Sequence, residues 1–333
     1  MKIFITGIAG FLGSHLADRM LALGHEVAGN DTLIGGYIDN VPAGAVFHQV
    51  DCCDNDSMTK IMAGSNIVYH CAATAHEGLS IFSPNFITRN IFQASVSTIS
   101  AAAQNHVKRF VYCSSMARYG NQQAPYKETQ APAPIDPYAI AKVAAEDVLK
   151  CIAEIADMEW VIAVPHNIVG PRQKYDDPFR NVMSIMINRI LQDKPPIVYG
   201  DGSQMRCFSF IDDCIFCLEK LALDTTIKND IFNIGPDEES VTLKHLAELI
   251  IDELGFAGEP EFFPDRPKEI KYATCDSTKA REMLGYKTST TLIDGIRKTA
   301  KYIETRGIKP FDYSYPLEIV NDRTPKTWTD RLI

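Results

Sequence analysis

A glycine-rich loop near the start of the chain constrains its fold more than any other feature. Residues 7–13 read GIAGFLG; they follow an apolar run at 2–6 and open a helical pattern at 13–23. Gly7 and Gly10 let the backbone turn tightly and approach a pyrophosphate, and Gly13 lets the helix pack closely on the strand. Amides at a helix N-terminus attract phosphate oxygens. Because position and flanking elements agree, we predict a dinucleotide site rather than a purely structural turn.

An acidic residue follows the second predicted strand, residues 26–30. Asp31 is placed to accept hydrogen bonds from the adenosine ribose diol and would repel a 2′-phosphate, so NAD is favoured over NADP. The alternative is an aspartate that only forms a turn. Asp51 is placed like an adenine-binding aspartate, and the small residues Ala72 and Ala73 leave room for a cofactor against the sheet.

Short apolar runs alternate with helical patterns through the first half of the chain. This alternation predicts an α/β fold, a Rossmann doubly wound parallel sheet with helices on both faces. The expected strands are 2–6, 26–30, 67–71, 109–114 and 159–165, and the expected helices are 13–23, 87–105 and 138–155.

After Pro171 the pattern loosens into proline-rich pieces and separated helices, which predicts a smaller C-terminal α/β substrate lobe. The later helices are expected near 181–192, 243–254 and 277–284. We assign 1–170 to the NAD-binding domain, with some later segments returning to it, 171–310 mainly to the substrate lobe, and 311–333 to a C-terminal extension without clear periodicity.

Composition narrows the classes of partner. A net charge of −9 gives no electrostatic reason to expect nucleic acid or an anionic membrane. No apolar run approaches the ~20 residues of a membrane span, and no signal-peptide pattern follows Met1. The nine cysteines are an odd number, and the CxxC pair Cys214 and Cys217 falls in a helical pattern without a second pair. We therefore expect no metal and a reduced, cytoplasmic protein.

Tyr138 and Lys142 lie four residues apart in the predicted helix 138–155, so they share one face. A phenol with a pKa near 10 is a poor base at neutral pH, and a neighbouring cation stabilises the phenolate. Alone, this spacing is common on helix surfaces. Together with the glycine loop it predicts a catalytic pair.

The chain resembles the extended short-chain dehydrogenase/reductases, in their nucleotide-sugar epimerase/dehydratase branch. The resemblance covers about residues 1–305. The motifs that carry it, in order, are the glycine loop, Asp31, Ser114-Ser115, Tyr138 with Lys142, NIVGPR at 167–172, GDGSQMR at 200–206, FIDD at 210–213 and DSTKA at 276–280.

The resemblance implies that Ser115 and Tyr138 flank the sugar 4-hydroxyl, and that Lys142 holds the nicotinamide ribose and lowers the Tyr138 pKa. It also implies that Arg206 and Arg266 grip the diphosphate, a task suited to guanidinium forks. The implied cofactor residues are Gly7, Ala9, Gly10, Phe11, Leu12, Gly13, Asp31, Asp51, Cys52, Cys71, Ala72, Ala73, Asn90, Tyr138, Lys142 and Pro165. The implied substrate residues are His76, Ser115, Met116, Ala117, Tyr138, Asn167, Arg206, Arg266 and Ala273.

The segment after Ser115 separates members of this branch. Residues 116–120 read MARYG and carry no acidic pair, so a 4,6-dehydratase would lack its general acid and base. An inert segment there resembles the 4-epimerases, and we predict an NAD-dependent nucleotide-sugar 4-epimerase that favours UDP-linked sugars. The alternatives are a nucleotide-sugar 4-oxidoreductase, an epimerase of a uronate or GDP-sugar, and a non-catalytic NAD(H)-binding sensor.

Features around the expected sugar pocket leave the substrate open. Ala273 aligns with a gatekeeper position, where a small residue would admit an N-acetyl group; a one-residue shift would place Tyr272 there instead. Arg118 is unusual at its position and could recognise an acidic sugar, or form a surface salt bridge. His76 and Glu77 lie where sugar contacts are common, and His166 replaces a more usual apolar or aromatic residue.

The resemblance also implies a homodimer, with the helices at 87–105 and 138–155 pairing between copies. Small residues on the first helix, namely Ala94, Ser97, Ala101 and Ala102, would permit close packing there. The extension from 311 onward is expected either to cover the active-site lobe or to join the dimer.

Overall fold

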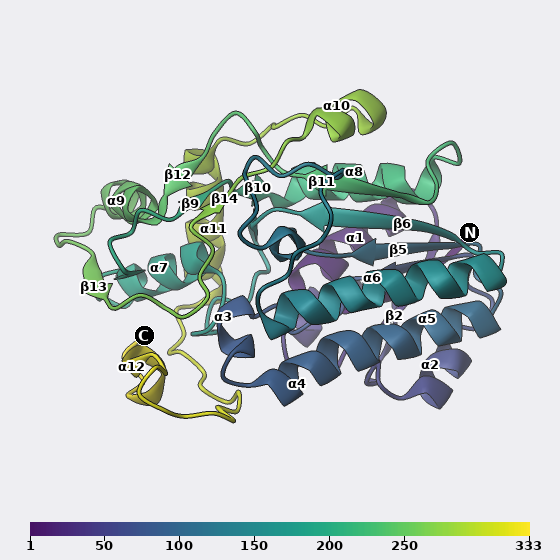
Figure 1. Ribbon diagram of the computed structural model, residues 1–333, viewed down its shortest axis with the longest axis horizontal. Helices are drawn as coiled ribbons and strands as arrows, with labels where there is room; N and C mark the ends of the chain where they lie inside the picture. The colour runs from purple at the N-terminus through teal and green to yellow at the C-terminus, as the bar shows by residue number, and fades with distance from the viewer.

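A seven-stranded parallel sheet forms the centre of the computed structural model, which describes all residues 1–333 (Figure 1). Its order is β11-β6-β5-β4-β1-β2-β3. The strands are β1 (Lys2–Thr6), β2 (Glu26–Asn30), β3 (Val46–His48), β4 (Ile67–His70), β5 (Arg109–Cys113), β6 (Glu159–Pro165) and β11 (Asp230–Ile234). Successive strands are added outward from β1 through β2 to β3, and then on the other side of β1 from β4 onward. Ligands bind at the carboxyl ends of parallel strands at such a switch in strand order. The predicted fold class is confirmed.

Helices cover both faces of this sheet because side chains alternate along each strand. Ile3 and Ile5 point into a core shared with α1 (Phe11–Ala22) and α8 (Ile211–Leu223). Phe4 points into a second core, shared with α2 (Asn55–Ile61), α5 (Ala94–Gln104) and α6 (Pro137–Ile155). The helix predicted at 87–105 is three pieces in succession: α4 (Pro84–Thr88), one π-helical turn (Arg89–Gln93) and α5.

A second lobe lies beyond the carboxyl ends of the strands (Figure 1). In it α7 (Val182–Leu191) packs against α9 (Leu243–Leu254) and α11 (Leu292–Arg306). Its strands form a small sheet β12-β9-β14 and the pairs β13-β8 and β10-β7. They are β7 (Ile168–Val169), β8 (Ile197–Tyr199), β9 (Met205–Arg206), β10 (Ser209–Phe210), β12 (Val241–Thr242), β13 (Glu261–Phe263) and β14 (Tyr272–Ala273). The remaining helices are α3 (Glu77–Ser80), α10 (Thr278–Leu284) and α12 (Lys326–Thr329), with short 3₁₀ turns at Ile38–Asn40 and Met116–Tyr119.

The segment from 311 to the end is part of the packed structure. Tyr315, Trp328 and Ile333 are buried in a third core with Phe82 and Phe179. The Glu318 carboxylate accepts hydrogen bonds from the backbone amides of Asn85 and Phe86, at 2.9 and 2.7 Å. The extension therefore covers the active-site side of the molecule, one of its two predicted positions. No helix is long and apolar enough to cross a bilayer.

The small residues assigned to a contact between copies are buried within the single chain instead. Ala94, Ala101 and Ala102 belong to the core beneath α5, and Ser97 is also buried. α5 packs there against α2 and α6 of the same chain, and this intramolecular contact needs the small side chains. The prediction for these four residues is therefore wrong.

Candidate active site

The glycine loop between β1 and α1 has the geometry that only glycine permits. Gly7 has φ +71°, and a Cβ there would lie 3.0 Å from the backbone of Ala72. A Cβ on Gly13 would lie 2.2 Å from the carbonyl oxygen of Gly7. Gly10 caps α1 without a side-chain hydrogen bond, and no acidic residue occupies the first turn. The helix N-terminus is therefore free to receive a pyrophosphate.

Asp31 and Asp51 mark the adenosine end. The Asp31 carboxylate accepts hydrogen bonds from the amides of Ala9 and Leu33, at 3.1 and 2.8 Å, which fixes it beside the glycine loop. Burial raises the pKa of Asp31, although these amides oppose the shift. Asp51 lies farther along, 2.8 Å from the guanidinium of Arg89. A carboxylate held against the loop fits an unphosphorylated ribose, so the residues present fit NAD.

A single cavity of about 390 Å³ joins this end to the second lobe. Of the predicted cofactor residues it is lined by Gly7, Gly10, Phe11, Leu12, Gly13, Asp31, Asp51, Cys52, Cys71, Ala72, Ala73, Asn90, Tyr138, Lys142 and Pro165. Of the predicted substrate residues it is lined by His76, Ser115, Met116, Tyr138, Asn167, Arg206 and Arg266. Ala9, Ala117 and Ala273 do not line it.

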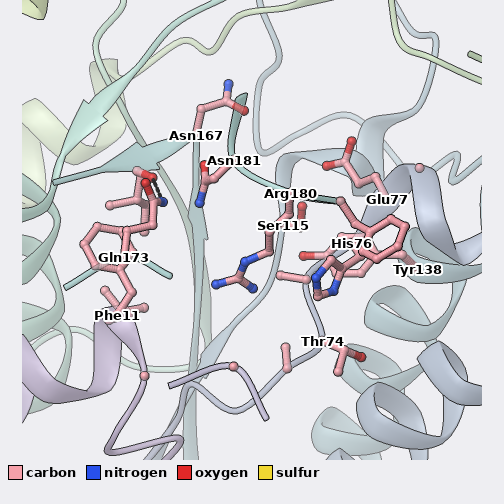
Figure 2. A pocket seen from close by; sticks show the side chains of 18 of the residues that line it. Phe11, Thr74, His76, Glu77, Ser115, Tyr138, Asn167, Gln173, Arg180 and Asn181 are labelled. Carbon is pink, nitrogen blue, oxygen red and sulfur yellow. Dashed lines mark hydrogen bonds between the residues drawn. The ribbon is translucent and has the colours of Figure 1, made fainter. Parts of the chain in front are cut away.

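Ser115 and Tyr138 lie close together in the middle of this cavity (Figure 2). Ser115 caps a 3₁₀ turn, its hydroxyl accepting the Ala117 amide at 3.2 Å. Asp136 caps α6 by accepting the Ala139 amide at 2.8 Å, which sets the first turn of α6 and hence Tyr138. The catalytic pair thus begins a capped helix beside the carboxyl end of β5.

Burial dominates the electrostatics of the pair. It raises the pKa of Tyr138, and the Ser115 hydroxyl and Arg180 oppose that shift. Lys142 donates to the carbonyl oxygen of Cys113 at 2.8 Å, which fixes its ammonium group against β5. Burial lowers the pKa of Lys142 to about 8. The lowering of the Tyr138 pKa by Lys142 stays a prediction.

Two arginines from the second lobe converge on one carboxylate. Arg266 makes a bidentate pair with Glu269, at 3.1 and 2.9 Å, and Arg206 lies 3.7 Å from the same carboxylate. The Arg266 guanidinium also stacks 4.6 Å from the centre of the Tyr199 ring. Two cations against one anion leave a net positive site on the cavity wall, suited to a diphosphate.

Sequence reasoning missed several polar residues of the cavity. Asp177 lies within hydrogen-bond distance of His76, at 2.7 Å, and both side chains are almost completely buried. Arg180 lies in the same cavity without any carboxylate within ion-pair distance, and its Nε has no hydrogen-bond partner (Figure 2). Asp177 and Arg180 come from the polar loop at 173–181, a run of charged residues just before a predicted helix that could have been flagged.

Glu77 was noticed in the sequence without a role. Desolvation raises its pKa to about 7, with Asp136 adding to the shift and the two diphosphate-site arginines opposing it. The carboxyl group therefore changes charge near neutral pH beside Tyr138. Gln173, Asn181, Tyr315 and Ile333 also line the cavity and were not predicted.

Two interpretations of the sugar pocket need correction. Arg118 is buried away from the cavity, where it makes a bidentate pair with Glu146 of α6, at 3.1 and 2.9 Å. It neither reaches a substrate nor lies at the surface. Ala273 pairs with Arg206 in the β9–β14 ladder, and its side chain is fully buried in the core shared with α5 and α6. Tyr272, the alternative gatekeeper, is half exposed and also outside the cavity lining.

Comparison with known proteins agrees with this geometry. The profile of the NAD-dependent epimerase/dehydratase family matches residues 3–235. The UDP-glucose 4-epimerase of Mycolicibacterium smegmatis is 32% identical over 317 residues, covering 92% of this chain and 99% of that relative.

Solved structures of similar proteins support the same family. The UDP-glucose 4-epimerase of Thermotoga maritima with UDP-glucose superimposes with a TM-score of 0.86 at 29% identity, covering 92% of this chain and 99% of that one. The UDP-glucuronic acid 4-epimerase of Bacillus cereus, in complex with UDP-glucuronic acid and NAD, gives 0.85 at 27% identity, covering 92% and 100%. This chain belongs to the NAD-dependent epimerase/dehydratase family.

Proposed function

We propose that this NAD-dependent nucleotide-sugar epimerase inverts C4 of a UDP-linked hexose or N-acetylhexosamine. The observation that carries the proposal is one cavity that holds Ser115 and Tyr138 between the glycine loop and the arginines Arg206 and Arg266. The turn after Ser115, Met116–Tyr119, contributes no acidic side chain to that cavity. The relatives above, named as 4-epimerases, support the same reaction.

NAD, when bound, supplies reversible acceptance of hydride from C4. The glycine loop would hold its pyrophosphate, Asp31 its adenosine ribose and Asp51 its adenine, with Lys142 at the nicotinamide ribose. The fit rests on the glycine contacts and the uncapped start of α1 described above.

The chain's own residues handle the proton. Tyr138 removes the proton of the 4-hydroxyl while C4 is oxidised, and it returns the proton to the 4-oxygen when C4 is reduced on its opposite face. The Ser115 hydroxyl hydrogen-bonds the Tyr138 phenolate and stabilises it. Arg206 and Arg266 keep the diphosphate in place, so the sugar can turn about its linkage while the nucleotide stays bound. No second acid or base is needed.

An acidic sugar is a second candidate substrate, and one specific observation favours it. Arg180 is a cation in the cavity without a carboxylate partner, close enough to Tyr138 and Asp177 to lower the pKa of each. A uronate carboxylate would supply the missing partner, since a partly buried guanidinium gains from a counter-ion within hydrogen-bond distance. The Bacillus cereus relative acts on UDP-glucuronic acid, as its name states.

One experiment tests both candidates. Purified protein without added NAD is incubated separately with UDP-glucose, UDP-N-acetylglucosamine, UDP-glucuronate and GDP-mannose, and products are read by NMR. Conversion of one sugar to its 4-epimer supports the proposal and identifies the substrate class. If nothing converts until NAD is added and NADH then accumulates, the protein is an oxidoreductase that releases a keto-sugar.

The proposed assembly is a homodimer in the cytoplasm. The outer faces of the π-helical turn and α6 expose Phe92, Ile140 and Ile155, with 37%, 53% and 81% of their surface accessible. Apolar side chains on neighbouring helices favour burial against a second copy. Light scattering after size exclusion measures the mass directly, and Ile140→Glu should convert a dimer to a monomer. A wild-type mass of 37.0 kDa would contradict the dimer.

A further inference from the structure

We propose that His166, Cys207 and Cys275 bind a zinc ion outside the active-site cavity. His166 directly follows β6, Cys207 follows β9, and Cys275 lies just beyond β14. The three potential ligand atoms all lie within 4.8 Å of one another, and all three residues are buried. None of the three lines the active-site cavity.

The ring nitrogens of His166 have no polar partner in the structure, and a bound metal ion would provide one. The residue is fully buried, yet neither ring nitrogen has a hydrogen-bond partner. Leaving a buried polar group unpaired costs about 1–3 kcal/mol, so native proteins rarely do so. A metal ion would satisfy one nitrogen directly.

The two thiols are also placed for a metal. Cys275 has weak partners only, the Pro236 carbonyl at 3.8 Å and the Ser277 hydroxyl at 3.4 Å. The Cys207 sulfur is also buried, and it lies within 4.8 Å of the Cys275 sulfur and of a ring nitrogen of His166, so the three ligand atoms can share one ion.

The geometry suits zinc. Zn–S bonds of about 2.3 Å and Zn–N bonds of about 2.0–2.1 Å place tetrahedral ligand atoms roughly 3.3–3.8 Å apart, so side-chain shifts of about 1 Å suffice. The backbone around the cluster is tight: a Cβ on Gly235 would lie 2.9 Å from the Cβ of His166 and 3.2 Å from the Cys275 sulfur. The protein supplies a Cys₂His set, and the fourth position is open to solvent.

A second cavity, of about 330 Å³, gives a route to this position. Cys207 and Cys275 both line it, together with the carboxylates Asp237, Glu239 and Asp276. Asp237 is paired with Arg281 at 2.6 Å, and Asp276 lies 3.5 Å from Lys127. Glu239 forms no ion pair. An opening with three carboxylates beside two cations attracts a divalent cation.

The site would tie together segments that bind the substrate. His166 precedes Asn167 in sequence, and Arg206 precedes Cys207. The Asn167 amide also donates to the Cys207 carbonyl at 2.9 Å. Zinc would therefore cross-link the strands that present Asn167 and Arg206, and it should raise Tm because it binds only the folded chain.

The test measures the metal itself. Full-length protein is purified under reducing conditions, and zinc is measured by mass spectrometry before and after chelation. Stripped protein is then titrated with Co²⁺, whose thiolate charge-transfer and tetrahedral absorption bands report the ligand set. We expect about one equivalent per chain, a Tm that rises on reloading, and loss of at least tenfold in affinity in Cys207→Ser, Cys275→Ser and His166→Phe.

Cys214→Ser and Cys217→Ser are matched controls, because these buried cysteines lie in α8 and should leave metal binding unchanged. Wild-type protein that takes up neither Zn²⁺ nor Co²⁺ overturns the proposal. So does equal uptake by the folded ligand variants, or a Cys207–Cys275 disulfide that leaves seven titratable thiols in place of the nine in the chain. If the variants do not fold, the cobalt spectrum of the wild-type protein decides alone.

Discussion

The buried pair of Arg118 and Glu146 leads to a quantitative prediction about stability. Both residues are almost inaccessible, 1% and 0% exposed, and Glu146 also accepts the hydroxyl of Ser114. Arg118→Met would leave the carboxylate of Glu146 buried without its counter-ion. Breaking such a pair costs about 3–5 kcal/mol, which lowers the folding equilibrium constant roughly 10²–10⁴-fold.

The double variant Arg118→Met with Glu146→Leu should recover most of that loss. Its free energy of unfolding should lie within about 2 kcal/mol of the wild type, because only the Ser114 hydroxyl then lacks its partner. Lys150→Met is the matched control on the same helix. Lys150 forms an exposed pair with Asp147 at 3.2 Å, and such pairs contribute about 0–1 kcal/mol.

The assay is chemical denaturation at a fixed NAD concentration, since NAD binding itself stabilises the folded chain. KM for UDP-glucuronate is measured on the same samples. A loss below about 1 kcal/mol in Arg118→Met would refute the argument from burial. A raised KM for the acidic sugar with unchanged stability would instead indicate that Arg118 contacts the substrate.

Four further predictions concern the cavity. Tyr138→Phe should keep NAD affinity and lose turnover by about 10²–10⁴-fold, the size of a general-base contribution; a near-normal kcat would contradict its role. Because burial lowers the pKa of Lys142 to about 8, kcat/KM should fall as pH rises through about 8 and the ammonium loses its proton. In Lys142→Arg the fall in kcat/KM near pH 8 should disappear, because arginine keeps its proton. If the fall remains, it comes from the titration of another group. If an acidic sugar is the substrate, Arg180→Leu should raise KM for UDP-glucuronate at least tenfold more than KM for UDP-glucose. Asp31→Ala should lower the preference for NAD over NADP, measured as the ratio of their Kd values.

Local chemistry by itself determined the sheet and the cofactor end of the site. Several strands and helices, including β1, β2, β6 and α9, have the predicted bounds, because the apolar periods of strands and helices are local. Gly13 and Asp31 could be assigned from the chain because the contacts that define their roles, with Gly7, Ala9 and Leu33, all lie in the short stretch around β1 and β2.

Only the tertiary structure decided the substrate end. Arg118 could not be placed without knowing that Glu146, on a helix that begins many residues later, would bury it. The sequence predicted Ala273 to line the sugar pocket, but pairing of β14 with β9 directs its side chain into the core. The same holds for the tail at 311–333 and for the cluster of His166, Cys207 and Cys275. The residues that contact one another there are distant in sequence, so local sequence patterns do not predict the contacts, which form only when the chain packs.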